Sequence, residues 1–85
     1  MLTIEWKDAA AAILLKLSPS VAARIVLRVE WMAEHFAEAR AEALSGPFAG
    51  LLKLRVGDYR VIYEVDRARS VLVVRHVGHR SAIYR

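Results

Sequence analysis

The sequence contains no cysteine, only two prolines and four glycines. Without cysteine there is no disulfide framework and no thiolate metal site, which fits a reducing compartment such as the cytoplasm. The three histidines are scattered and form no His-x-x-x-His pair, so we expect neither a metal site nor a cofactor. The longest apolar run, residues 9–15, is far shorter than the ~20 residues that span a bilayer. No secretory signal peptide is evident, and we expect no membrane association.

Acidic side chains are scarce in the second half of the chain. The 85 residues include 13 basic and 9 acidic side chains, for a net charge of +4. Residues 1–50 have a net charge of −1, whereas residues 51–85 carry eight basic and three acidic side chains. Seven of those eight are arginines, which bind phosphate bidentately and stack on bases. This half therefore predicts an anionic partner, with nucleic acid as the first candidate and an acidic protein as the second.

The first half of the chain is predicted to be a short strand followed by two helices. Residues 1–85 suffice for a single domain. The strand covers residues 2–6, and an alanine-rich helix follows until Ser18 and Pro19 interrupt it. Ser18 can cap a second helix with Pro19 in its first position, and we expect this helix to run to about Ala43. Its apolar residues recur at spacings of three and four: Ala22, Ile25, Val29, Met32 and Phe36.

Residues 50–65 are predicted to form a hairpin. Gly57 and Asp58 separate two alternating runs, and glycine in the first central position suits a two-residue type II′ turn. Counting outward from this turn places Arg55 opposite Arg60. Because side chains alternate between the faces of a strand, one face is apolar. The apolar face comprises Leu52, Leu54, Val56, Tyr59, Val61 and Tyr63. The other face holds Lys53, Arg55 and Arg60 around Ile62.

The remaining segments complete an α+β domain. Ser45, Gly46 and Pro47 end the second helix and open a loop. The last strand is expected from Ser70 to Val77, with Gly78 interrupting it, and residues 79–85 form a tail with room for a turn of helix. The predicted order is β-α-α-β-β-β, with a mainly antiparallel four-stranded sheet and a helical hairpin packed on one face. The other face, where Lys53, Arg55 and Arg60 point, is expected to be open.

The predicted pairing of Arg55 with Arg60 bears on whether the basic face is merely solvated or functional. Like charges directly opposite one another cost stability on the ~0.2–1 kcal/mol scale of cross-strand pairs. In an arbitrary protein, the simplest interpretation is a solvated basic face. The density of arginine in residues 51–85 favours a functional interpretation here.

Several motifs in the second half resemble the RelE/ParE superfamily of toxins from type II toxin–antitoxin systems, and the RelE branch in particular. The motifs are Gly46-Pro-Phe-x-Gly, Leu52-Lys-Leu-Arg, Asp58-Tyr-Arg-Val-Ile-Tyr, Val77-Gly-His-Arg and a terminal Tyr84. The resemblance covers the whole chain in length and element order. It is most specific over residues 46–85.

The resemblance implies an enzyme, a metal-independent endoribonuclease that cleaves mRNA on the ribosome and inhibits translation. It assigns the catalytic roles to Lys53, Arg60, Arg80 and Tyr84. The family pattern has a further lysine on the strand of Lys53, where this sequence has Leu51. The cations and imidazole expected to contact RNA around these residues are Arg55, Arg75, His79 and Arg85. The implied partners are the ribosome, mRNA and an acidic RelB-like antitoxin that binds the toxin in a hetero-oligomer.

The chemistry of these side chains suits cleavage by the 2′-hydroxyl of RNA. Lys53 and Arg60 on one face can hold a phosphate and stabilise its developing negative charge. Arg80 can stabilise the leaving oxygen, although arginine is a poor proton donor. Tyr84 can orient or deprotonate the 2′-hydroxyl or stack on a base, and His79 is an alternative proton carrier. His76 and His35 are assigned structural roles.

Two other functions are also compatible with the sequence. A ParE-like toxin inhibits DNA gyrase and requires no nuclease cluster. A non-catalytic basic module binds RNA or an acidic protein without cleaving anything. Substitution of Arg80 separates the first from a nuclease, and the absence of a cleavage product identifies the second.

Overall fold

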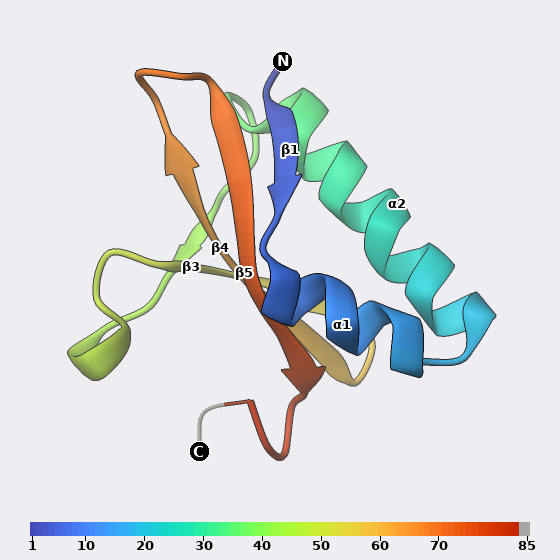
Figure 1. The fold of residues 1–85 in the computed structure, drawn as a ribbon. Helices are drawn as coiled ribbons and strands as arrows, with labels where there is room; N and C mark the ends of the chain where they lie inside the picture. The colour runs from blue at the N-terminus through green and yellow to red at the C-terminus, as the bar shows by residue number, and fades with distance from the viewer. Residues whose placement is uncertain (84–85) are drawn as a thin grey trace.

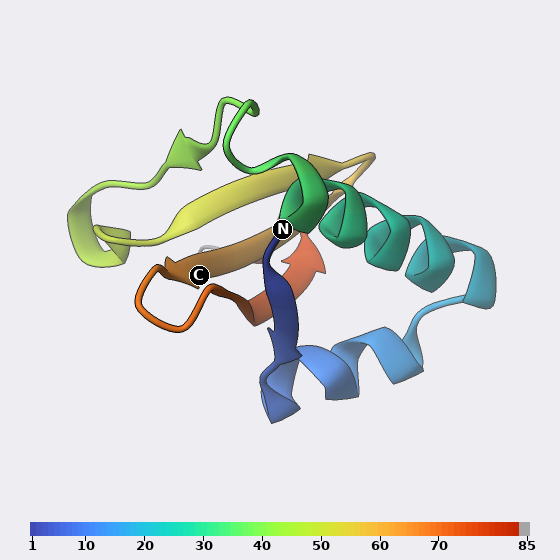
Figure 2. The same cartoon turned by 90° about the horizontal axis from the view of Figure 1, so that it is seen from above.

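Five strands form one mixed sheet in the order β1-β5-β4-β3-β2 across residues 1–83, the part of the chain that this computed structural model describes. The strands are β1 (Thr3–Trp6), β2 (Glu42–Ala43), β3 (Leu52–Val56), β4 (Tyr59–Asp66) and β5 (Val71–His79). The helices are α1 (Asp8–Lys16), α2 (Pro19–His35) and the short 3-10 helix η1 (Gly46–Phe48). Both long helices lie on one side of the sheet (Figures 1 and 2). The α+β class and the helical hairpin are therefore confirmed.

The hairpin between β3 and β4 has the predicted register. Val56 faces Tyr59 and Arg55 faces Arg60, and the pairing continues outward to Leu52 and Tyr63. Gly57 has a φ of 59°, while Asp58 is not among the residues with positive φ. A positive φ at the first central residue alone identifies a type II′ turn, because type I′ requires it at both.

The apolar face of this hairpin joins the core. Leu54, Val56, Val61 and Tyr63 are buried together with residues of β5 and α2, including Val74 and Ile25. The stripe predicted on α2 supplies Ile25, Val29 and Met32 to this core. Tyr63 is 1% exposed, and its hydroxyl has no hydrogen-bond partner within residues 1–83. Burial, with a smaller contribution from the charge of Glu42, raises the pKa of Tyr63 to about 12.

The second helix is shorter than predicted, and the sheet gains a strand as a result. Helix α2 ends at His35 rather than Ala43, and the amides of Glu38 and Ala39 both donate to the carbonyl of His35 as the chain turns. Phe36 and Ala39 pack against the core after this turn. The chain then reaches the sheet edge, where Glu42 pairs with Lys53 and Ala43 with Leu52. Tertiary packing thus overrides the helix propensity of the alanines and glutamates in this segment.

The last strand is longer than predicted, because Gly78 does not interrupt it. Strand β5 continues to His79, with Gly78 opposite Arg60 and His79 opposite Tyr59. The register between β4 and β5 shifts at one point. Ile62 pairs with His76 and the next residue, Tyr63, pairs with Val74, so Arg75 is unpaired and forms a β-bulge. On its other edge, β5 pairs in parallel with β1 over residues 71–74.

The start of α2 agrees with the sequence prediction, with Pro19 in its first turn and Ser18 at the N-cap. The Ser18 side chain makes no capping hydrogen bond. Within residues 1–83, no helix has both the length and the apolar character needed to cross a membrane.

Candidate nucleic-acid interface

The face of the sheet away from α1 and α2, here called the open face, carries three of the predicted site residues at its hairpin end. Lys53 and Arg55 alternate on β3 with buried Leu54, and Arg60 faces Arg55 from β4. All three therefore point to the same side of the sheet. Ile62 lies among them and is only 1% exposed, so the cations surround a covered apolar centre rather than a bare apolar surface.

The guanidinium of Arg60 is held by the backbone of the hairpin turn. Its Nη1 donates to the carbonyl oxygens of Gly57 at 3.0 Å and of Tyr59 at 2.9 Å. These two bonds use one nitrogen of a group that has five N–H donors. The other nitrogens of Arg60 remain available to an anion, while the side chain is already oriented.

Lys53 and Arg55 share one carboxylate. Glu42 of β2 places Oε2 3.6 Å from Lys53 Nζ and Oε1 3.6 Å from Arg55 Nε. Both separations exceed the 2.7–3.2 Å typical of N–H···O hydrogen bonds, so the ion pairs are loose. The Lys53 side chain is 20% exposed and that of Arg55 is 60% exposed.

Arg80 lies beside the same turn as Arg60. Its amide donates to the carbonyl of Asp58 at 2.8 Å, and its Nε lies 3.7 Å from Asp58 Oδ1. The backbone bond anchors the residue immediately after β5 to the β3–β4 turn. Arg80 and Arg60 thus come from distant parts of the sequence to one end of the sheet.

His79 is turned away from the open face. It faces Tyr59, whose ring packs against the core, and the two rings meet edge to face with centroids 5.6 Å apart. The Nδ1 atom of His79 accepts the amide of Ser81 at 3.2 Å and lies 2.8 Å from Ser81 Oγ. The structure therefore places His79 with the tail and the apolar face, rather than beside Lys53 and Arg60.

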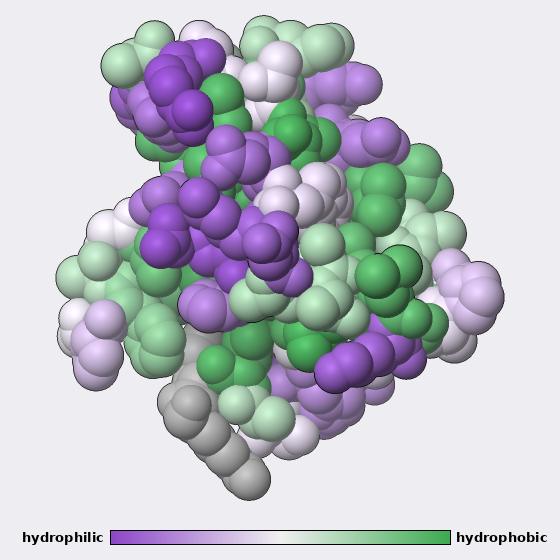
Figure 3. All heavy atoms as spheres, viewed as in Figure 1, coloured by the Kyte–Doolittle hydropathy of each residue, from purple (hydrophilic) through white to green (hydrophobic). Residues whose placement is uncertain are grey.

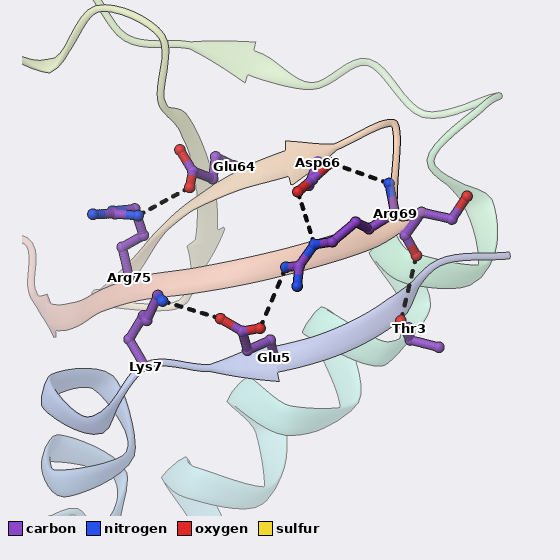
Figure 4. A network of polar contacts seen from close by, with 8 residues as sticks. Thr3, Glu5, Lys7, Glu64, Asp66, Arg69 and Arg75 are labelled. Atoms are coloured by element: carbon purple, nitrogen blue, oxygen red, sulfur yellow. Dashed lines mark hydrogen bonds and ion pairs between the residues drawn. The ribbon is translucent and has the colours of Figure 1, made fainter.

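Arg75 belongs to a separate network of charges at the other end of the open face (Figure 4). Its Nη1 donates to Glu64 Oε1 at 2.9 Å. Nearby, Arg69 binds Asp66 at 2.9 Å and lies 3.4 Å from Glu5, which also pairs with Lys7. Polar side chains gather here and over the β4–β5 turn in the space-filling view (Figure 3). Acids and bases alternate in this network, so it offers less uncompensated positive charge than the end that carries Arg60.

Residues 80–83 fold back onto the open face next to Arg60. Gly78 lies directly opposite Arg60, and a Cβ built on Gly78 would lie 2.8 Å from Ile83 Cδ1. Ile83 therefore covers Gly78, and a pocket of about 500 Å³ next to it is lined by Phe48 and His76 among others. Tyr84 and Arg85 lie outside the described residues.

The structure thus brings Lys53, Arg55, Arg60 and Arg80 to the hairpin end of the sheet, and it separates Arg75 and His79 from them. Sequence reasoning missed the carboxylates of Glu42, which lies 3.6 Å from Lys53 and Arg55, and of Asp58, which lies 3.7 Å from Arg80. No local signal identifies Glu42, because its alanine-rich surroundings favour a helix. Within residues 1–83, no group of three or more His, Asp or Glu side chains could hold a metal ion.

The fold is shared with toxins of known structure. A chain of the RelBE2 toxin–antitoxin complex from Mycobacterium tuberculosis matches with a TM-score of 0.82 and 25% identity, covering 92% of this chain and 96% of that chain. The isolated RelE toxin of E. coli matches with a TM-score of 0.78 and 20% identity, over 99% of this chain and 92% of that one. A YoeB/ParE toxin from Agrobacterium tumefaciens matches with a TM-score of 0.75 and 16% identity, over 92% and 98%.

A family model gives the assignment from sequence. The model described as the ParE toxin of the type II toxin–antitoxin system parDE matches residues 4–84. The chain therefore belongs to this toxin family, and the resemblance to the RelE/ParE superfamily is confirmed. A comparison with curated proteins finds no match.

Proposed function

We propose that this toxin is a metal-independent endoribonuclease that cleaves mRNA on the ribosome in the cytoplasm and thereby inhibits translation. One observation carries the proposal: Lys53, Arg55 and Arg60 share the open face at the hairpin turn to which Arg80 is anchored. Within residues 1–83, these cations have no carboxylate–histidine pair and no group of metal-binding side chains beside them. Such a cluster suits a reaction in which the nucleophile belongs to the RNA.

The proposed chemistry follows from the charges. The 2′-hydroxyl of the RNA attacks the neighbouring phosphate, and the O–P bond to the next nucleotide breaks. Lys53 and Arg60 bind the phosphate oxygens, where negative charge grows in the transition state. Arg60 is suited to this role because the Gly57 and Tyr59 carbonyls hold it in place before the substrate arrives. Arg80 stabilises the leaving oxygen, and Tyr84 is assigned to the 2′-hydroxyl by the family motif.

We expect the ribosome to supply part of the catalytic geometry, because the cation cluster has no dedicated carboxylate–histidine pair within residues 1–83. His79, the histidine next to Arg80 in the sequence, packs against Tyr59 and accepts a hydrogen bond from the Ser81 amide. General acid–base catalysis requires a group within hydrogen-bond reach of the proton that moves. We therefore expect the ribosome to fix the geometry of the mRNA, and we expect naked RNA to be cleaved poorly.

We propose that an acidic RelB-like antitoxin controls this activity in a hetero-oligomer. The matching structure from M. tuberculosis is titled a toxin–antitoxin complex, and another is a RelE–RelB complex from Pyrococcus horikoshii. The net charge of +4 in this chain favours an acidic partner.

The proposal is tested by mapping mRNA 5′ ends on stalled ribosomes with the purified toxin. Arg60→Ala and Arg80→Ala are each expected to lower the cleavage rate about 100-fold or more, the scale for loss of one preorganised electrostatic group. Arg67→Ala is the matched control. Arg67 is a turn cation stacked over Phe36 at the opposite end of β4, and its removal should leave the rate within about twofold. Wild-type protein that produces no cut on ribosomes contradicts the proposal.

Inhibition of DNA gyrase is the second candidate, and it is favoured by the ParE description of the family model. A supercoiling assay with the same variants separates the two functions. A gyrase inhibitor keeps its activity in Arg80→Ala, whereas a nuclease has no effect on supercoiling. Binding of RNA without any cleavage product would instead identify a non-catalytic module.

A further inference from the structure

A second cluster of cations lies around the outer edge of β3. Strand β2 pairs only with Leu52 and Lys53, so the edge of β3 beyond Lys53 is uncovered. A pocket of about 250 Å³ opens there between α2, the chain that follows it and β3. We call it the edge pocket. Its charged and aromatic lining comprises Arg28, Trp31, Arg40, Glu42, Lys53 and Arg55.

The edge pocket has four cations and one carboxylate. Glu42 is 3.6 Å from both Lys53 and Arg55 and is half exposed. Arg28 and Arg40 form no ion pair with any residue in the range 1–83. Exposed ion pairs of this length contribute little to stability. The pocket therefore has more positive charge than its own carboxylate neutralises, and that carboxylate is loosely held.

The aromatic side chain of the edge pocket is already stacked. The Arg28 guanidinium lies 5.2 Å from the centre of the Trp31 ring, and His35 stacks on the same side chain at 4.7 Å. Trp31 is therefore poorly placed to stack on a base. It fixes Arg28 through a cation–π contact, and the chemistry that the pocket offers is recognition of an anion.

We propose that the edge pocket binds a backbone phosphate of single-stranded RNA, next to the phosphate held at Arg60, and that Glu42 is an internal competitor for this site. The inference rests on the proposed function only for the identity of the RNA. Arg55 links the two sites, because it lines the edge pocket and lies directly opposite Arg60. A phosphate that binds Arg55 takes the position of the Glu42 carboxylate. Guanidinium groups bind phosphate with paired hydrogen bonds, which the 3.6 Å contacts to Glu42 do not provide.

The competitor is tested by the isosteric change Glu42→Gln. Binding of a short fluorescent single-stranded RNA is measured by anisotropy over a series of salt concentrations. Removing one charge near 4 Å from its partners in water is expected to tighten binding about fivefold at low salt. Glu38→Gln makes the same change in net charge at an exposed position outside the pocket lining, and should change affinity less than about twofold.

The pocket cations are tested separately, so that the result does not depend on one variant. Arg28→Gln and Arg40→Gln should each weaken RNA binding about fivefold. Each should also reduce the slope of log K against log salt by about 0.7, the value for one phosphate contact with a single strand. Arg67→Gln is the control, since it removes an arginine from the opposite end of β4. Thermal unfolding checks that each variant is folded.

The proposal is overturned if Glu42→Gln binds RNA no more tightly than Glu38→Gln, or if the pocket arginines behave like Arg67. It is also overturned if neither wild type nor Glu42→Gln binds RNA, or if Glu42→Gln gains affinity for poly-glutamate and not for RNA. The proposed nuclease function fails independently. A toxin that leaves ribosome-bound mRNA intact while Glu42→Gln tightens RNA binding refutes the cleavage and supports the edge pocket.

Discussion

Arg55 and Arg60 lie directly opposite one another on β3 and β4, and their side chains are directed to different acceptors. Arg60 donates to the Gly57 and Tyr59 carbonyls at the turn, whereas Arg55 lies 3.6 Å from Glu42 at the sheet edge. The protein accommodates two like charges on a ladder by drawing them apart. The same separation gives the open face two neighbouring points at which an anion can bind.

The repulsion between Arg55 and Arg60 should lower the stability of the hairpin. We expect Arg55→Thr to raise the free energy of unfolding by ~0.2–1 kcal/mol, because it removes the repulsion and places a β-branched residue on the strand. The same change should weaken RNA binding. Urea unfolding and anisotropy measure the two effects. Arg75→Thr is the contrasting control, since Arg75 is paired with Glu64 at 2.9 Å and its loss should not stabilise the protein. An Arg55 variant that is less stable than wild type contradicts this account.

Gly78 should control the position of residues 80–83 rather than the stability of β5. Its backbone is not in the positive-φ region, so alanine introduces no backbone strain, but the new Cβ meets Ile83 Cδ1 at 2.8 Å. We expect Gly78→Ala to displace Ile83 from the open face and to reduce mRNA cleavage about tenfold or more, the scale for misplacing a reacting group. The melting temperature should change little.

A second substitution tests this explanation of the Gly78 effect. In Gly78→Ala/Ile83→Ala the Ile83 Cδ1 atom is gone, so residues 80–83 can return to the sheet. The double variant should recover cleavage relative to Gly78→Ala, beyond what Ile83→Ala shows alone. Additive losses would mean that the two residues act separately.

The network of Glu5, Asp66 and Arg69 should make stability depend on acidic pH. Lys7 chiefly, and Arg69 as well, lower the pKa of Glu5 below its ordinary value of 4.5. Hydrogen bonds from Arg69 lower the pKa of Asp66 below 3.8. A depressed pKa in the folded state stabilises the protein above the unfolded pKa, and this contribution is lost as pH falls through the folded value.

Arg69→Gln is therefore expected to lower the melting temperature at pH 7 and to have progressively less effect as the pH falls through the folded-state pKa values of Glu5 and Asp66, because the carboxylates then become protonated in both states. Differential scanning calorimetry across this range measures the change. Arg67→Gln serves as the control because Arg67 stacks on Phe36 rather than joining the network. An Arg69→Gln deficit of the same size at acidic and neutral pH would show that packing, rather than charge, is responsible.

The sequence determined the local parts of this protein. Alternation of apolar and polar residues, together with Gly57 in the turn, fixed the register from Val56–Tyr59 to Leu52–Tyr63 and the face on which Lys53, Arg55 and Arg60 lie. These features follow from the two-residue period of side chains along a strand and from the positive φ of Gly57. Both depend only on residues that are neighbours in the sequence. The motifs of residues 46–85 also determined the superfamily.

Only the tertiary structure decided where α2 ends and which partners the cations have. Residues 36–43 have helical propensity, yet Phe36 and Ala39 gain more by packing on the core, and the chain turns to place Glu42 beside Lys53 and Arg55. The sequence predicts that Gly78 interrupts the last strand, but β5 continues through it because Gly78 pairs with Arg60 of β4. Such contacts join residues far apart in the chain. Their free energy depends on burial that no local pattern encodes. The cations of the site could therefore be predicted from the sequence, whereas their acidic partners, Glu42 and Asp58, became known only from the tertiary structure.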